Sequence, residues 1–314
     1  MKIRFILNPV SGRNARTVRL RPLLLDYIRD RSLDAELHVT EGPGHAIELA
    51  RNAVQVGCQR VVAIGGDGTL NEVAQGLVHT PAALALVPCG SGNGLALHLG
   101  IPLAPRAALE LAAASSARIT AIDTGSVNGH PFFNAMGLGL DADISLRFNQ
   151  LTSRGLPAYV STGFAAFNQR RSERCKITSG NRSEVIDILL IAIANSDQYG
   201  NRAFIAPGAS VVDGQLDLIA IRPVNHVGAA FLGSRLFLGT IDHSPDTFRL
   251  RGTRFVIERP APGLVHTDGE THETGAKVEV CVHPQSLRIV VPALLRAIAK
   301  PAKTPSADFA PQPS

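Results

Sequence analysis

Apolar and polar residues alternate in blocks over the first 120 residues. Short apolar runs predict four strands, at residues 3–7, 35–40, 60–64 and 83–87. Helical spacing of apolar residues predicts three helices between and after them, at residues 17–31, 44–56 and 106–114. This regular exchange of strand and helix is typical of a Rossmann-like α/β domain built on a parallel sheet.

The pattern changes at about residue 121. Short strands separated by turns are predicted at residues 118–123, 130–135, 184–194, 215–221, 254–258 and 277–283, with helices near 161–171 and 227–238. Such a series is typical of an antiparallel β-sandwich or barrel-like domain. We therefore expect an α/β domain over residues 1–124, a β-rich domain over 125–287, and a Pro-rich disordered tail over 301–314.

Composition indicates a cytoplasmic protein. A chain of 314 residues can form two domains with sizeable cores. Its four cysteines, Cys58, Cys89, Cys175 and Cys281, form no Cys-x-x-Cys pair, which argues against a zinc site or a disulfide framework. The apolar run at the N-terminus is too short for a signal peptide, and no stretch is long enough to cross a bilayer.

The chain is basic, with a net charge of +5. A denser group of arginines lies beside apolar residues 156–160 and 164–167, and comprises Arg147, Arg154, Arg170, Arg171 and Arg174. Basic and apolar residues together suit a protein that takes a lipid from the inner face of a membrane, although a scattered basic surface explains the charge equally well. No aromatic-rich or helix-turn-helix signature indicates a nucleic-acid partner.

The most informative motif is Gly65-Gly66-Asp67-Gly68-Thr69-Leu70-Asn71-Glu72. It lies between the predicted buried strand at residues 60–64 and a helix predicted to start at residues 72–77, so its glycines allow a sharp turn and its amides face an anion at the helix N-terminus. A carboxylate in such a phosphate cradle suggests a nucleotide with Mg²⁺. The motif is neither a P-loop nor a complete Gly-x-Gly-x-x-Gly sequence.

Two further turns follow predicted strands. Asn8-Pro9-Val10-Ser11-Gly12 follows the first strand, and Pro88-Cys89-Gly90-Ser91-Gly92-Asn93-Gly94 follows the fourth. Any one of these turns could be a simple strand-to-helix connection without a ligand. Because the carboxyl ends of parallel strands meet at one edge, three such turns predict a nucleotide site.

These turns, in this order, resemble the diacylglycerol kinase/sphingosine kinase catalytic-domain family of soluble lipid kinases. The resemblance continues through Asn134 to Ala142, through Asp213-Gly214-x-Leu216 and through Asp268-Gly269-Glu270, and spans about residues 2–292. It implies phosphoryl transfer from ATP with Mg²⁺ in a cleft between the two domains. It also implies that residues 288–300 return to complete the first domain, with a helix from residue 292.

The resemblance implies a nucleotide site made of the three turns and one further threonine. Its predicted residues are Asn8, Pro9, Ser11, Gly12, Thr40, Gly65, Gly66, Asp67, Gly68, Thr69, Asn71, Glu72, Gly90, Ser91 and Asn93. Asp67 would act through Mg²⁺. Thr40 has an alternative explanation as the cap of the helix predicted over residues 44–56.

Two Asp-Gly sequences carry the remaining predicted chemistry. By resemblance, Glu270 accepts the proton of the lipid hydroxyl and Asp268 supports it; alone, Asp-Gly-Glu is an ordinary turn. The resemblance also implies a structural Mg²⁺ held by the Asp213 carboxylate and by the carbonyls of Ser210 and Gln215. A simple hairpin turn is the alternative there.

Gly94 stands where diacylglycerol kinases usually have Asp, and Ser91 where they have Thr, so the sequence leaves a diacylglycerol-like or a sphingoid acceptor open. An NAD kinase, which shares Gly-Gly-Asp-Gly-Thr, is the second hypothesis, and the first turn and Asp268–Glu270 speak against it. A non-catalytic nucleotide or lipid sensor is the third, supported only by Gly94. We expect a lipid partner at the membrane surface; a homodimer is compatible with the sequence, which does not fix the oligomeric state.

Overall fold

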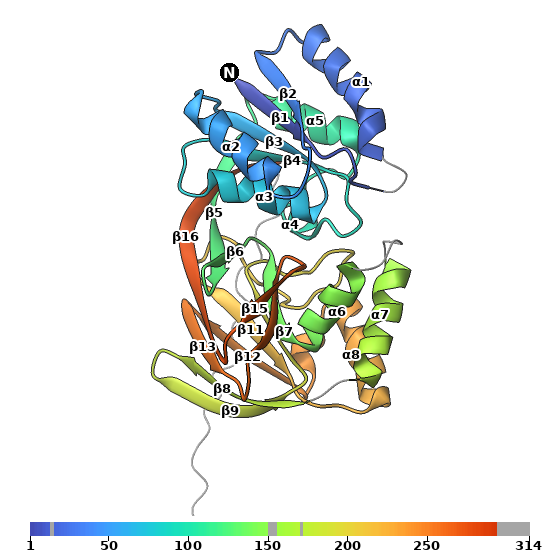
Figure 1. Cartoon of the computed structure of the whole chain (residues 1–314), viewed down its shortest axis with the longest axis vertical. Helices are drawn as coiled ribbons and strands as arrows, with labels where there is room; N and C mark the ends of the chain where they lie inside the picture. The colour runs from blue at the N-terminus through green and yellow to red at the C-terminus, as the bar shows by residue number, and fades with distance from the viewer. Residues whose placement is uncertain (13–15, 150–155, 170–171, 294–314) are drawn as a thin grey trace, which may run out of the picture.

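The computed structural model describes residues 1–12, 16–149, 156–169 and 172–293 (Figure 1). An α/β domain formed by the N-terminal part of the chain lies above a β-rich domain that has helices on one side. This arrangement confirms the predicted fold class.

The α/β domain follows the predicted order of strands and helices. Its elements are β1 (Ile3–Leu7), α1 (Arg16–Asp30), β2 (Ala35–Val39), α2 (His45–Gln55), β3 (Arg60–Gly65), α3 (Asp67–Leu77), β4 (Ala83–Pro88), α4 (Gly94–His98) and α5 (Pro105–Ala113). The strands pair in parallel in the order β2-β1-β3-β4. β1, β3 and β4 are buried along their whole length, which explains why they are apolar runs rather than alternating ones.

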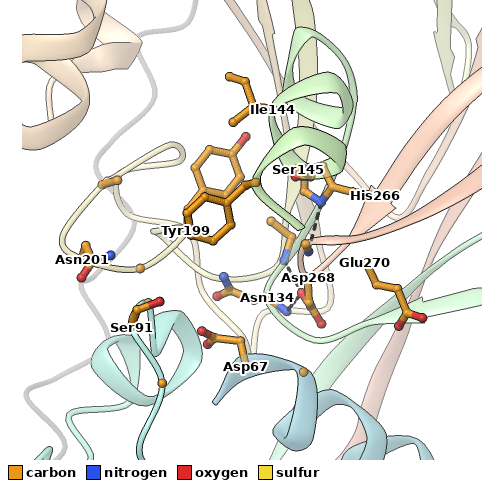
Figure 2. Close-up of a pocket in the computed structure, with 18 of the residues that line it drawn as sticks. Asp67, Ser91, Asn134, Ile144, Ser145, Tyr199, Asn201, His266, Asp268 and Glu270 are labelled. Atoms are coloured by element: carbon orange, nitrogen blue, oxygen red, sulfur yellow. Dashed lines mark hydrogen bonds between the residues drawn. The ribbon is translucent and has the colours of Figure 1, made fainter. Parts of the chain in front are cut away.

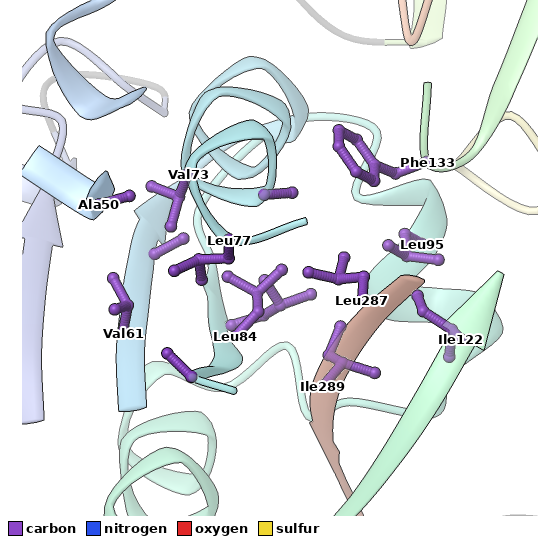
Figure 3. Packing of buried hydrophobic residues seen from close by; sticks show 14 of the residues in the cluster. Ala50, Val61, Val73, Leu77, Leu84, Leu95, Ile122, Phe133, Leu287 and Ile289 are labelled. Atoms are coloured by element: carbon purple, nitrogen blue, oxygen red, sulfur yellow. The ribbon is translucent and has the colours of Figure 1, made fainter. Parts of the chain in front are cut away.

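The core of this domain includes residues from distant parts of the chain. Val61 and Leu84 of the sheet pack with Leu77 of α3, and with Phe133 and Leu287 (Figure 3). Because the last two belong to segments that lead into the β-rich domain, burying them fixes the α/β domain against its neighbour.

Two long strands, rather than a flexible linker, join the domains. β5 (Arg118–Val127) runs without a break through the predicted boundary, beside β16 (Lys277–Val291). The end of β16 pairs in parallel with β4, at Ile289 and Leu84, so residues 288–291 complete the first sheet as a strand. The helix predicted from residue 292 and the tail over 301–314 fall, apart from Pro292 and Ala293, outside the described residues.

The β-rich domain is a sandwich. Its further elements are β6 (His130–Phe132), β7 (Ala135–Gly139), α6 (Leu140–Asn149), α7 (Leu156–Asn168), β8 (Glu173–Ser179), β9 (Arg182–Ile188), β10 (Leu190–Ala194), β11 (Leu216–Ile221), α8 (His226–Leu238), η2 (Ile241–His243), β12 (Thr247–Gly252), β13 (Arg254–Glu258), β14 (Gly263–Thr267) and β15 (Glu270–Thr274). A six-stranded antiparallel sheet, β12-β11-β10-β7-β14-β15, packs on the lower part of the sheet that continues from β16 through β13, β8 and β9. Ile193 and Leu218 of the first meet Ile177 and Phe255 of the second in the core.

The predicted strands differ from the structure where the chain changes sheets. Residues 184–194 form two strands, β9 and β10, which belong to different sheets. The hairpin of β14 and β15 was not predicted, because the sequence of β15, Glu-Thr-His-Glu-Thr, has no apolar side to mark it. The turn of this unpredicted hairpin carries Asp268.

Candidate active site

The three predicted turns meet at the carboxyl edge of the parallel sheet. Asn8 Nδ2 donates to Thr69 Oγ1 over 3.0 Å, and Ser11 Oγ lies 3.3 Å from the same hydroxyl. The turn after β1 is thereby fastened to the first turn of α3. These two predicted turns, which are 58 or more positions apart in sequence, therefore lie side by side, as the strand order predicts.

Close backbone contact explains two of the glycines. A Cβ atom on Gly90 would lie 2.6 Å from the Cα atom of Gly66, so neither turn leaves room for a side chain where β3 and β4 end. A Cβ atom on Gly68 would meet nothing within 4 Å. The first turn of α3 therefore has free space beside Gly68, an arrangement that suits a phosphate group at the helix N-terminus.

Asp67 begins α3 and connects the second and third turns. Its Oδ2 accepts from the Asn93 amide over 2.8 Å, and its Oδ1 accepts from the Gly94 amide over 3.0 Å. Burial raises the pKa of Asp67, and these two hydrogen bonds act in the opposite direction. The carboxylate lines the cavity beside Ser91 and Asp268 (Figure 2).

Besides Asn8, Thr69 and Asp67, three more residues predicted to bind nucleotide have partners within the protein. Both carboxylate oxygens of Glu72 accept backbone amides, from Gly44 and Ala46, so Glu72 caps α2. Asn93 adopts a left-handed conformation, with φ of 53°, and its side-chain amide closes its own turn through Gly90. These side chains shape the site, and their polar atoms are already used.

Asn71 is the third of these residues. Its Nδ2 donates to Asp268 Oδ2 over 2.8 Å, and its Oδ1 accepts from Gln75. Asn71 belongs to the α/β domain and Asp268 to the β-rich domain, so this bond connects the two domains across the cleft.

Thr40 is buried at the end of β2 and lines the cavity. The alternative explanation, that Thr40 caps the following helix, is wrong. The N-cap of α2 is Gly44, with φ of 80°. The backbone amides of Gly44 and Ala46 donate to Glu72 rather than to Thr40.

Asp268 is an anchor whose hydrogen-bonding capacity is fully used. Its Oδ1 accepts from the amides of Asn134 and Ala135, each over 2.9 Å. Its Oδ2 accepts from the Phe133 amide and from Asn71, each over 2.8 Å. A carboxylate has about four acceptor positions, so Asp268 has none left for a substrate proton. Burial raises its pKa, against the lowering effect of these bonds.

Glu270 lies two positions further, on the other side of the turn. Its side chain is exposed at the cavity wall, and no described residue forms a hydrogen bond or ion pair with its carboxylate (Figure 2). The turn is built by Asp268 and Gly269, with φ of 50° and 92°. Of the two predicted catalytic carboxylates in this turn, only Glu270 is available to accept a proton.

A buried polar cluster next to this turn was not assigned any role from the sequence. The Tyr199 hydroxyl donates to Asp141 Oδ2 over 2.5 Å, and His266 Nε2 lies 3.0 Å from the same oxygen. Asp141 and His266 are almost completely buried. The signal for Asp141 was its place in the motif from Asn134 to Ala142, whereas nothing near Tyr199 or His266 in the sequence marks them as its partners.

One cavity of about 1720 Å³ joins the phosphate turns to an apolar chamber in the β-rich domain. The turns of the α/β domain and Asp268–Glu270 line its polar end. Apolar side chains from several elements line the other end, including Leu140, Ile144, Phe167, Ile205, Leu232 and Leu236. The site therefore has one part suited to an anion and another suited to an apolar molecule.

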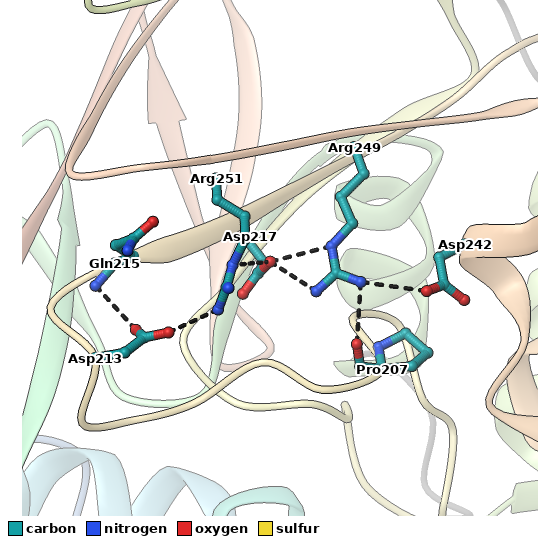
Figure 4. A network of polar contacts seen from close by, with 7 residues as sticks. All are labelled: Pro207, Asp213, Gln215, Asp217, Asp242, Arg249 and Arg251. Carbon is teal, nitrogen blue, oxygen red and sulfur yellow. Dashed lines mark hydrogen bonds and ion pairs between the residues drawn. The ribbon is translucent and has the colours of Figure 1, made fainter. Parts of the chain in front are cut away.

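In the structure, the Asp213 carboxylate predicted to hold Mg²⁺ is paired with an arginine. Asp213 Oδ2 accepts from Arg251 over 2.6 Å, and Oδ1 accepts from the Gln215 amide over 3.1 Å (Figure 4). Arg251 also lies 3.0 Å from the buried Asp217. The positive charge that the predicted Mg²⁺ would supply is already present as a guanidinium. In the described part of the chain, no group of three or more His, Cys, Asp or Glu residues is placed to hold a metal.

The predicted basic group is only partly seen. Arg154, Arg170 and Arg171 lie outside the described residues. Arg147 donates to Gln169 over 2.7 Å, and Arg174 is exposed on β8. Within the described ranges, no helix has the length and apolarity needed to cross a bilayer.

Comparison with known proteins agrees with this site. Residues 2–127 match the diacylglycerol kinase catalytic domain, and residues 134–291 match the YegS C-terminal NAD kinase beta sandwich-like domain. The chain belongs to the YegS-like lipid kinase family. It is thus a kinase, and the family resemblance predicted from its motifs is confirmed.

Relatives in this family cover nearly the whole chain. The probable lipid kinase YegS-like of Pseudomonas aeruginosa is 32% identical over 270 residues, which are 84% of this chain and 87% of the relative. The probable lipid kinase YegS of Escherichia fergusonii is 29% identical over 293 residues, 90% and 94% of the two chains. A crystal structure of a diacylglycerol kinase from Bacillus anthracis str. Sterne shares the fold, with a TM-score of 0.71 at 20% identity over 94% and 98% of the chains.

The unusual Gly94 has a packing explanation. A Cβ atom there would lie 2.6 Å from Asn134 Nδ2 and 2.7 Å from the Tyr199 carbonyl oxygen. The segments before β7 and after β10 therefore approach this turn too closely for a side chain. Gly94 no longer supports the sensor hypothesis, because packing alone accounts for it.

Proposed function

We propose that the protein transfers the γ-phosphoryl group of ATP to the hydroxyl group of a lipid. The observation that carries this proposal is one continuous cavity, which connects the predicted phosphate-binding edge with an apolar chamber and is lined at its polar end by the carboxylate of Glu270, which bonds to no described residue. A lipid with its chains in the chamber would present its hydroxyl near Glu270. This polarity favours a lipid over NAD, whose two nucleotides have no use for an apolar chamber.

ATP would bind at the three turns. The N-terminus of α3 at Gly68 would receive phosphate groups, while Thr69, Ser11 and Ser91, which line the cavity, would supply hydroxyl contacts. Mg²⁺ bound with the triphosphate would neutralise its charge, and Asp67 is the carboxylate nearest to these turns that could hold it. Phosphoryl transfer depends mainly on such positioning and charge neutralisation.

Glu270 would take the proton from the lipid hydroxyl as the oxygen attacks the γ-phosphorus. A positioned general base is typically worth about 10²–10⁴ in rate. Asp268 holds the turn in place through its four hydrogen bonds, and through Asn71 it keeps the turn aligned with α3. We assign Asp268 to positioning for this reason. The product would be a phosphorylated lipid, released at the membrane surface from which the acceptor comes.

A radiolabelled-ATP assay tests the proposal and the acceptor together. Diacylglycerol, sphingosine, ceramide and NAD are offered separately with Mg²⁺, and the products are separated by chromatography. We expect label in at least one lipid and none in NAD. Label in NAD alone would support the NAD kinase hypothesis, and label in no acceptor, with ATP still bound, would support a sensor.

A further inference from the structure

Helix α8 is apolar on two opposite faces. Ala229, Leu232, Gly233 and Leu236 face the cavity. On the opposite face, at helical spacing, Val227, Phe231 and Leu238 have exposed fractions of 63%, 66% and 74%, with Ser234 as the fourth member. A surface helix of a globular protein normally has a polar outer face, so the outer face of α8 lacks its partner.

The outer face continues into the lipid chamber. Phe237 and Ala230 lie between the two faces of α8; both side chains are exposed and both line the cavity. A molecule bound against the outer face would therefore lie next to an apolar path inward. A second protein covering this face would close that path, whereas a bilayer would supply the molecule that uses it.

Charge around α8 also favours an acidic lipid surface. The helix contains no Asp or Glu, and its one full charge is Arg235. Arg222 is exposed just before the helix, and α7 contains no acidic residue. Asp242 of η2, which packs against α8, is paired with Arg249. Apolar residues flanked by arginines are typical of helices that lie in the interface of a membrane.

We propose that the outer face of α8, defined by Val227, Phe231, Ser234 and Leu238, docks onto a bilayer that contains anionic lipids. The acceptor lipid then enters the chamber past Phe237 and Ala230. This inference rests on the proposed lipid kinase function, because it assigns the route by which that substrate arrives. The helix lies on the side of the β-rich domain away from β9, so the two regions can be compared within one protein (Figure 1).

The absence of tryptophan from the chain allows a background-free fluorescence probe. Phe231→Trp places the probe on the outer face of α8, and Val185→Trp places a matched probe on β9, where the side chain is 56% exposed. The vesicles are phosphatidylcholine, with and without phosphatidylglycerol. We expect the emission of Phe231→Trp to shift to shorter wavelength, more strongly with phosphatidylglycerol, and that of Val185→Trp to stay unchanged.

A second measurement separates docking from catalysis. The double variant Phe231→Ser with Leu238→Ser removes two apolar side chains from the outer face, so we expect its vesicle partition coefficient to fall by at least about tenfold. Phosphorylation of a short-chain, water-soluble acceptor should be unchanged, while phosphorylation of the long-chain acceptor in vesicles should fall. Val185→Ser is the control, and an unchanged melting temperature shows that the double variant is folded.

Several results would overturn the docking proposal. The first is that the double variant binds vesicles as strongly as the parent protein does. The second is that the two tryptophan probes show equal spectral shifts. The third is that the double variant changes its oligomeric state without a change in vesicle binding. The last would assign the face to contacts between copies of the chain. Vesicle binding is measured without ATP, so a failure of the proposed kinase function, with no labelled lipid, remains distinguishable from a failure of docking.

Discussion

Two turns of this protein share the sequence Asp-Gly and have different surroundings. In Asp268-Gly269-Glu270 the aspartate accepts three backbone amides and Asn71, and the turn faces the cavity. In Asp213-Gly214-Gln215 the aspartate accepts the Gln215 amide and the guanidinium of Arg251. Both glycines have positive φ, 92° and 69°, so each turn needs glycine at its second position; Asp268 also has a positive φ, of 50°.

The two turns differ in the hydrogen-bond donors that surround the aspartate carboxylate. Backbone and side-chain amides are neutral, so they hold the Asp268 carboxylate in place and leave its charge in the cleft. Arg251 is a cation, so it cancels the charge of Asp213 within the loop. An Asp-Gly dipeptide therefore predicts a turn, whereas the groups that the fold brings to the aspartate carboxylate decide whether its charge stays in the cleft or is neutralised.

The largest effect should come from removing the anchor of the catalytic turn. Asp268→Asn leaves one acceptor oxygen and turns the other position into a donor, so two of the four donors lose their acceptor. At about 1–3 kcal/mol for each buried unsatisfied group, the free energy of unfolding should fall by about 2–6 kcal/mol. Urea unfolding measures it.

Asp213→Asn is the matched control for this change. Its ion pair with Arg251 is partly exposed, so the expected loss is only about 1 kcal/mol or less. Equal losses in the two variants would contradict the anchor role of Asp268.

Glu270→Gln makes the catalytic turn Asp-Gly-Gln, the same sequence as the turn at Asp213. Without a proton acceptor, kcat should fall by at least about 10²-fold, a barrier increase of about 2.7 kcal/mol, while ATP affinity and melting temperature stay unchanged. Steady-state kinetics with saturating lipid and a nucleotide-binding titration check this. A variant that keeps most of its kcat would show that another group, or none, removes the proton.

Burial of Asp67 predicts a smaller, pH-dependent effect. Its pKa in the folded protein is raised from 3.8, so between 3.8 and the raised value the folded protein holds a proton that the unfolded chain has lost. The contribution of Asp67 to stability is therefore most favourable below pH 3.8 and is lost as the pH rises through the raised pKa. The side chain of Asn at this position does not titrate, so it makes no pH-dependent contribution to stability.

Asp67→Asn should therefore gain stability relative to the parent as the pH rises from about 4. Urea unfolding of both proteins across this range measures the difference. A difference that is constant with pH would mean that the Asp67 pKa is the same in the folded and unfolded states.

The smallest effect is expected at the Asp213 loop. Because Arg251 already supplies the positive charge, adding a chelator to the nucleotide-free protein should leave its melting temperature unchanged. Arg251→Gln should lower the melting temperature, and Mg²⁺ or Ca²⁺ should then raise it again if the loop can accept a cation in place of the guanidinium. A fall in the parent's melting temperature with chelator would restore the structural ion predicted from the sequence.

Much of the α/β domain could be predicted from sequence because its signals are local. Buried parallel strands are continuous apolar runs, and the turns after β3 and β4 carry glycines that close backbone contact requires. Strand order in a parallel sheet then brings the turns together. The prediction failed in the β-rich domain where strands are polar, as in β15, or change sheets, as between β9 and β10.

The roles of individual polar residues could be predicted less well. The sequence placed Asn71, Glu72 and Asn93 with the nucleotide because they lie in its motifs, yet each is held by a partner elsewhere in the fold or in its own turn. Tyr199 and His266 were missed because their common partner, Asp141, lies 58 and 125 positions away. Hydrogen bonds between residues so far apart along the chain leave no local sequence pattern from which they could be predicted.

The sequence by itself determined the α/β and β-sandwich architecture, the sheet edge at which the three glycine-containing turns gather and the family of the chain, because these follow from local backbone geometry and motif order. Only the tertiary structure decided that Asp268 is saturated while Glu270 is free, and that Arg251 neutralises Asp213. It also placed the two apolar faces of α8 against the chamber and the solvent. These features depend on which distant groups become neighbours, and that is fixed when the sheets and helices pack together.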